Sequence, residues 1–166
     1  MGMSYDIFTK AFLDKITEYD FITLDKEVSA DLVDGYMRRA CSQFNRICKY
    51  DLSARDDTSR MFNIDIPNED IDEIIDIVSE GMIVQWLKPY TYKSENLENV
   101  LNTSDYTTYS PAELLLRITN AYKMAQRDFR NMRVDYSYNH GDLGSLSLWL
   151  EIKYITRFSK TILIHL

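Results

Sequence analysis

The chain has 166 residues, of which 45% are hydrophobic and 27% charged, a balance typical of one folded globular domain and not of a disordered chain. Five glycines and three prolines are too few for an all-β sandwich with many tight turns, so long helices are favoured. The formal net charge of −7 argues against general attraction to nucleic acid, although a local basic face is still allowed.

Two helices are predicted in the N-terminal part. Apolar residues repeat at helical spacing between Tyr5 and Tyr19, and Ser4 can cap the free N–H groups at the start. A second, longer helix is expected from Ser29 to about Tyr50. Its apolar stripe consists of Val33, Tyr36 or Met37, Ala40, Phe44, Ile47 and Cys48, and Arg38, Arg39, Arg46 and Lys49 fall largely outside it.

Three small residues lie within this predicted second helix. Gly35 weakens it by up to about 1 kcal/mol relative to alanine, which indicates either close packing or simple tolerance. Cys41 and Cys48 would lie about 10 Å apart along the helix axis, beyond disulfide reach. We therefore expect buried thiols in a reducing compartment.

The pattern breaks between Asp51 and Pro67, where a polar stretch is followed by alternating residues from Met61 to Ile66 that suggest a short extended segment. Asn68 is expected to cap a third helix, with acidic residues in its first turns facing the positive end of the helix dipole. Pro89 ends it. Its apolar face is formed by Ile71, Ile74, Ile75, Val78, Met82, Gln85 and Trp86.

Tyr90–Tyr109 is predicted to be a long, Tyr-rich loop, and a loop of this length in a compact domain is usually functional or held by a partner. Ser110 and Pro111 then form a helix start in the preferred order. The fourth helix ends at Asn139-His140-Gly141. Its stripe is Leu114, Leu115, Ile118, Ala121 or Tyr122, Ala125, Phe129 and Met132.

The tail from Leu146 alternates apolar and polar residues, which favours a half-buried strand over a poorer helix. Such a strand could pair with a neighbouring subunit, or fold back on its own core near Ile64–Ile66. The sequence thus predicts a mainly α-helical protein, a four-helix bundle over residues 1–145 with a long loop, followed by an extended β arm over residues 146–166.

No motif in the sequence indicates catalysis. The histidines are His140 and His165, and no cysteine or histidine pair has zinc-ligand spacing. The carboxylates from Asp65 to Glu80 lack the pattern of a calcium loop. Gly-x-Ser-x-Gly and glycine-rich phosphate-binding turns are absent, as are a secretory signal and a membrane span. We therefore expect no enzyme activity, no cofactor and no membrane association.

One positive stripe follows from helical geometry. Lys123, Arg127 and Arg130 share a face of the fourth helix, and Arg133 lies on its border. The stripe could contact DNA phosphates or an acidic protein surface, or it could be an ordinary solvated face opposite the apolar stripe.

Four stretches from Trp86 to Ala112 carry a family resemblance: Trp86–Tyr90, Lys93–Leu97, Leu101–Tyr106 and Tyr109–Ala112. This part of the sequence resembles the neck, or head–tail connector (adaptor), proteins of tailed bacteriophages. The resemblance implies a non-catalytic helical adaptor, assembled in the host cytoplasm and located at the head–tail junction of the virion. There it would form a ring of twelve copies between the portal and the tail or stopper protein and help to retain DNA.

The resemblance also implies roles for particular residues, because subunits of such rings reach into their neighbours with loops and arms. Lys123, Arg127 and Arg130 would face channel DNA or an acidic partner. A soluble helical regulator that binds one phage or host protein through the Tyr-rich loop is the alternative. The candidates for subunit contacts are Trp86, Tyr90, Tyr92, Tyr106 and Tyr109, with Leu148, Leu150 and Ile152 in the arm.

Overall fold

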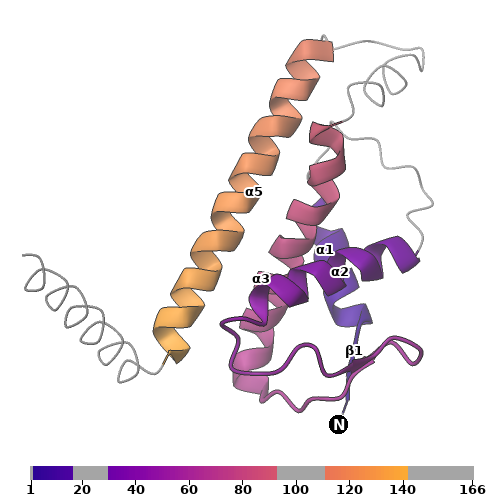
Figure 1. Cartoon of the computed structure of the whole chain (residues 1–166), viewed down its shortest axis with the longest axis vertical. Coiled ribbons are helices and arrows are strands. Elements are labelled where there is room, and N and C mark those ends of the chain that lie inside the picture. The colour runs from indigo at the N-terminus through magenta and orange to yellow at the C-terminus, as the bar shows by residue number, and fades with distance from the viewer. Residues whose placement is uncertain (1, 17–29, 93–110, 142–166) are drawn as a thin grey trace, which may run out of the picture.

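A computed structural model describes residues 2–16, 30–92 and 111–141 (Figure 1). Within these ranges the prediction of a mainly helical protein is confirmed. The elements are β1 (Met3–Ser4), α1 (Asp6–Ile16), α2 (Ala30–Phe44), β2 (Arg55–Asp56), β3 (Met61–Phe62), α3 (Asn68–Leu87), the 3-10 helix η1 (Lys88–Thr91) and α5 (Pro111–His140).

The core is built around α3. Helix α5 runs alongside it, α2 crosses it, and α1 packs on it as well (Figure 1). Every residue from Gly81 to Leu87 is buried, because this half of α3 is covered on all sides and is apolar almost all round. The ring of Trp86 meets that of Phe12 of α1 edge-on, with 6.3 Å between the centroids.

Gly81 lies where α2, α3 and α5 meet. A Cβ atom at this position would be 2.8 Å from Ala40 Cβ of α2 and 2.8 Å from Phe129 Cε2 of α5, well inside van der Waals contact. A residue without a side chain is therefore needed for both helices to approach α3 at the same level. Gly35 of α2 is different, because a Cβ there would have no neighbour within 4 Å. The tolerance interpretation of Gly35 is the correct one.

The small sheet has the strand order β1–β3–β2, with both pairs antiparallel. The predicted extended segment Met61–Ile66 is a strand only over Met61–Phe62, and the partners of that strand come from residues for which no strand was predicted. Phe62 is fully buried and stacks against Tyr5 and Phe8, at 5.0 and 5.4 Å between ring centroids. The sheet thus closes one end of the core.

Arg60 joins this sheet to the helices. It ends the turn between β2 and β3 with a φ of 53°, and its carbonyl accepts the Tyr5 N–H. Its guanidinium donates two hydrogen bonds to Asp34 of α2, at 2.9 and 3.0 Å, and lies 3.1 Å from Asp6 of α1. Because Asp34 is buried, this two-pronged bond supplies the counter-charge that the carboxylate needs.

The predicted end of α2 and the predicted cap of α3 were wrong, whereas both predicted ends of α5 are confirmed. Helix α2 stops at Phe44 instead of continuing to Tyr50, because the Asn45 side chain accepts the Leu52 N–H at 2.7 Å and turns the chain back. Pro67, not Asn68, occupies the position before α3, and no side chain caps that end. Helix α5 begins at Pro111 and ends at His140, as predicted. The predicted loop Tyr90–Tyr109 begins too early, because Tyr90 and Thr91 belong to η1. The rest of that loop from residue 93 and the arm 146–166 lie outside the described residues.

The contrast between the two helical glycines can be tested directly. We expect Gly81→Ala to lower the free energy of unfolding by about 1–3 kcal/mol, because the added methyl group must displace Ala40 or Phe129. Gly35→Ala should raise it by about 0.5–1 kcal/mol, because alanine is the better helix former and the site is open. Urea unfolding followed by circular dichroism measures both, and equal effects would disprove the close contact at Gly81.

A second pair of variants tests the role of Arg60. Arg60→Ala should destabilise the protein by about 3 kcal/mol, because it leaves the Asp34 carboxylate buried without its partner. The control is Arg38→Ala, which breaks an ion pair with Asp57 that is about half exposed and should change stability by less than about 1 kcal/mol. Adding Asp34→Asn to Arg60→Ala should recover part of the loss. If the two arginine variants unfold at the same denaturant concentration, the hydrogen bonds from Arg60 to Asp34 do not stabilise the fold.

Candidate interaction surface

The described residues include one histidine, two cysteines and several acidic side chains. Their histidine, cysteine and acidic side chains do not gather in any group of three that could hold a metal ion. Burial raises the pKa of Cys41 to about 12 and also raises that of Cys48, so neither thiol is a ready nucleophile at neutral pH. Burial likewise raises the pKa of Glu80, whose carboxylate lies 3.5 Å from Lys15 Nζ and links α3 to α1.

Helix α5 has two faces of different character. Its buried residues Ile118, Ala125, Phe129 and Tyr136 recur at helical spacing and face the core. The opposite side leaves large apolar side chains in solvent, where a surface helix normally carries polar residues. We call this side the outer face of α5. Its exposed apolar residues are Leu116 (59% exposed), Met124 (56%), Val134 (43%) and Tyr138 (68%).

The predicted basic stripe lies on this outer face. Lys123, Arg127 and Arg130 are all exposed. Arg127 Nε lies 3.3 Å from the carboxylate of Asp128, a solvent-exposed pair that is worth little energetically but reduces the local charge. In the described part of the chain, Lys123 and Arg130 have no ion-pair partner. The stripe therefore remains basic, with the charge of Arg127 partly offset by Asp128.

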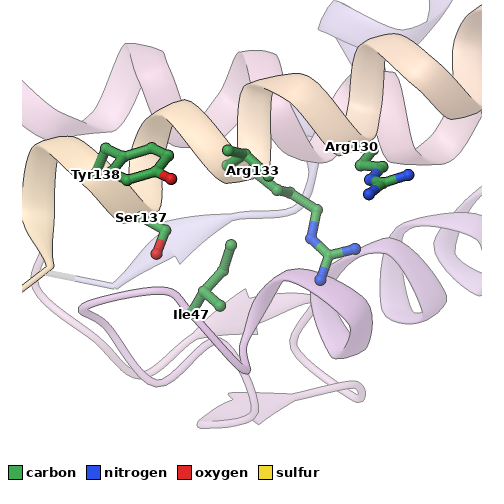
Figure 2. Close-up of a pocket in the computed structure, with 6 residues that line it drawn as sticks. Ile47, Arg130, Arg133, Ser137 and Tyr138 are labelled. Atoms are coloured by element: carbon green, nitrogen blue, oxygen red, sulfur yellow. The ribbon is translucent and has the colours of Figure 1, made fainter. Parts of the chain in front are cut away.

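A hollow of about 520 Å³ lies between the C-terminal half of α5 and the turn that follows α2 (Figure 2). Arg133 extends from α5 across this space toward α2, and its guanidinium carbon sits 5.2 Å from the centroid of the Phe129 ring. Burial lowers the pKa of Arg133, and the nearby charge of Arg46 lowers that pKa further. The residues lining the hollow are Ile47, Arg130, Arg133, Val134, Ser137 and Tyr138.

The position of the hollow depends on how the end of α5 is held. Tyr136 is fully buried, and its hydroxyl accepts the Lys49 N–H at 3.3 Å. One residue further along, Tyr50 donates its hydroxyl proton to Asp70 of α3 at 2.5 Å. His140 Nε2 lies 2.9 Å from Glu73 Oε2, also on α3. These contacts fix the C-terminal turns of α5 against the loop after α2 and the first turns of α3.

The other predicted contact residues are placed differently. Trp86 is only 2% exposed and belongs to the chain's own core, so its ring is not available for a subunit contact. Tyr90 is partly buried against Trp86, with 6.0 Å between the ring centroids, whereas Tyr92 is 76% exposed. The remaining candidates lie outside the described residues: Tyr106, Tyr109, Leu148, Leu150 and Ile152.

Comparison of the chain with known protein families, with curated proteins and with solved structures finds no match. None of the helices in the described ranges combines the length and the apolar character that a bilayer-spanning segment needs.

The Tyr50–Asp70 bond predicts a pH dependence. The Tyr50 hydroxyl, and after it Lys49, holds the pKa of Asp70 below its ordinary value of 3.8. A carboxylate with a lowered folded-state pKa stabilises the fold above the unfolded-state pKa, and this stabilisation is lost as the pH falls through the folded-state pKa. Wild type should therefore be more stable than Tyr50→Phe at pH 7, and the difference should shrink below about pH 4.

Thermal unfolding of both proteins between pH 2.5 and 7 measures this difference. Tyr92→Phe is the matched control, because the exposed Tyr92 ring should leave the pH profile unchanged. A Tyr50→Phe deficit that stays constant across the whole range would mean that the hydroxyl acts through packing and not through the Asp70 carboxylate.

Proposed function

We propose that the chain is a structural subunit that packs against copies of itself, and that it serves in the neck of a tailed phage. In this role it forms a ring between the portal and the tail or stopper protein and helps to retain packaged DNA. The sequence resemblance from Trp86 to Ala112 supports the neck assignment, and a mainly helical fold is compatible with it.

The outer face of α5 is the observation that carries this proposal. Helix α5 has 30 residues and is therefore about 45 Å long; it packs mainly on α3 and η1, and Tyr136 near its end also packs against Phe44 of α2. The opposite side presents Leu116, Met124 and Val134 to solvent over most of this length. Such a long mixed apolar and basic strip fits a protein partner better than a small ligand.

Charge favours a second copy of the chain as the neighbour. The net charge is −7, and yet α5 carries exposed cations such as Lys123. Exposed carboxylates lie elsewhere, for example Glu69 and Asp72 in the first turns of α3. A basic strip on one copy can therefore meet an acidic surface on the next. A contact between two different surfaces generates a ring when its rotation closes.

A regulator that binds one phage or host protein is the second candidate. Tyr92 favours it, because a tyrosine that is 76% exposed at the start of the Tyr-rich segment is typical of a contact residue. A stable one-to-one complex with a single partner would support this candidate over the ring.

Mass measurement and electron microscopy of the purified chain, alone and mixed with portal protein, test the proposal. We expect closed rings in one or both samples. Leu116→Glu should weaken self-association by about tenfold or more, because it places a charge in the outer face.

Leu13→Glu is the matched control, since Leu13 is an exposed leucine of α1, away from α5, and its replacement should leave assembly unchanged. A chain that is monomeric under every condition, portal included, would refute the ring. Equal weakening by both leucine variants would show that the outer face of α5 is not the contact surface.

A further inference from the structure

We propose that the hollow between α5 and the end of α2 binds a carboxylate side chain on an acidic segment of a partner protein, with Arg130 and Arg133 as the groups that hold it. This inference rests on the proposed function only in taking the partner to be a protein chain.

The two arginines are placed to act together. They lie three residues apart on α5 and therefore on the same side of the helix, and both border the hollow (Figure 2). Each guanidinium presents several N–H donors in a planar fork that matches the two oxygens of a carboxylate. Arg46 adds a third positive charge close enough to affect Arg133. Among the described residues that line the hollow, none carries a carboxylate.

Arg133 is incompletely satisfied in the described part of the chain. Its Nε atom is buried and has no hydrogen-bond partner there, which is unfavourable for a polar group. The stack on Phe129 orients the guanidinium but supplies no counter-charge. An arriving carboxylate would supply that counter-charge and would accept hydrogen bonds from the guanidinium after a small rotation of the side chain.

Other arginines of the chain show what Arg130 and Arg133 lack. Arg60 is paired with Asp34, Arg38 and Arg55 with Asp57, Arg117 with Glu113, and Arg127 with Asp128. The chain has 26 acidic residues, so carboxylates are not scarce. Arg39 and Arg46 also form no ion pair in the described part of the chain, so what sets Arg130 and Arg133 apart is that both border the same hollow.

The walls of the hollow favour a protein segment over a nucleic acid. Ile47, Val134 and the ring of Tyr138 are apolar, and the charged phosphates on the outside of duplex DNA would cover them poorly. The net charge of −7 also opposes a polyanion at long range. A glutamate or aspartate beside a leucine or an aromatic residue would satisfy both the arginines and the walls. A hollow of about 520 Å³ accommodates a few such side chains.

The test uses the full chain and a short acetylated peptide in which two glutamates are flanked by leucine and tyrosine. Isothermal titration compares it with the peptide that has glutamine at both positions, and with a duplex DNA of 12 base pairs. We expect the glutamate peptide to bind about tenfold more tightly than the glutamine peptide, because charge-assisted hydrogen bonds are lost in the latter. DNA should bind more weakly than the glutamate peptide.

Variants assign the binding to the hollow. Arg130→Gln and Arg133→Lys should each weaken peptide binding by about tenfold, the second because lysine keeps the charge but loses the fork. Lys123→Gln and Arg127→Gln are the matched controls, because they remove the same charge from α5 at positions that do not line the hollow. Thermal unfolding checks that every variant is folded, and the exposed Arg130 makes its variant safe in this respect.

Several results would overturn the inference: no binding of the glutamate peptide at millimolar concentration, equal weakening by Lys123→Gln and Arg130→Gln, or DNA as the tighter ligand. Failure here is separable from failure of the ring. A chain that assembles into rings but ignores the peptide disproves the carboxylate site alone. A chain that binds the peptide through Arg130 but stays monomeric with portal protein disproves the ring alone.

Discussion

The closeness of three helices at Gly81 is the constraint on which the rest of the structure depends. Ala40 of α2 and Phe129 of α5 both approach α3 at this residue, and neither leaves room for a methyl group. The contact fixes α5 against α3 and, through α3, against the end of α2. Phe129 also supports the guanidinium of Arg133. The Phe129 ring thus fills the core beside Gly81 and also contacts the Arg133 guanidinium near the surface. The position of that positive charge therefore depends on how α5 packs against α3.

The sequence predicts those parts of the fold that depend on neighbours along the chain. Apolar periodicity identifies all four described α-helices, and Pro111 and His140-Gly141 mark the two ends of α5 because proline and glycine act locally. The early end of α2 depends instead on a bond from Asn45 to Leu52, and β1 depends on pairing of residues 3–4 with residues 61–62. The first contact joins a side chain to the backbone across a turn and the second joins distant segments, and neither leaves a periodic signal in one sequence.

The sequence predicts which residues lie on the candidate surface, but not what surrounds each of them. Helical spacing alone places Lys123, Arg127 and Arg130 on one exposed face of α5. Helical spacing cannot show that these three residues have different surroundings. Arg127 is paired with Asp128, whereas Arg130 borders a hollow that is completed by Ile47, which lies after α2. Trp86 shows the opposite error. It was assigned both to the apolar face of its helix and, through the resemblance, to a subunit contact, and its burial in the covered half of α3 agrees only with the first assignment.

The pairing of β1 with β3 has a consequence for how the chain folds. Helices form from residues that are close in sequence, whereas Met3 must find Phe62 across almost the whole N-terminal half. Closing so long a loop for two paired residues is unfavourable until α1 and α3 have already brought the ends together. We therefore expect the sheet to form late in folding. Loss of the sheet would uncover the ring of Phe62, which is fully buried against Tyr5 and Phe8.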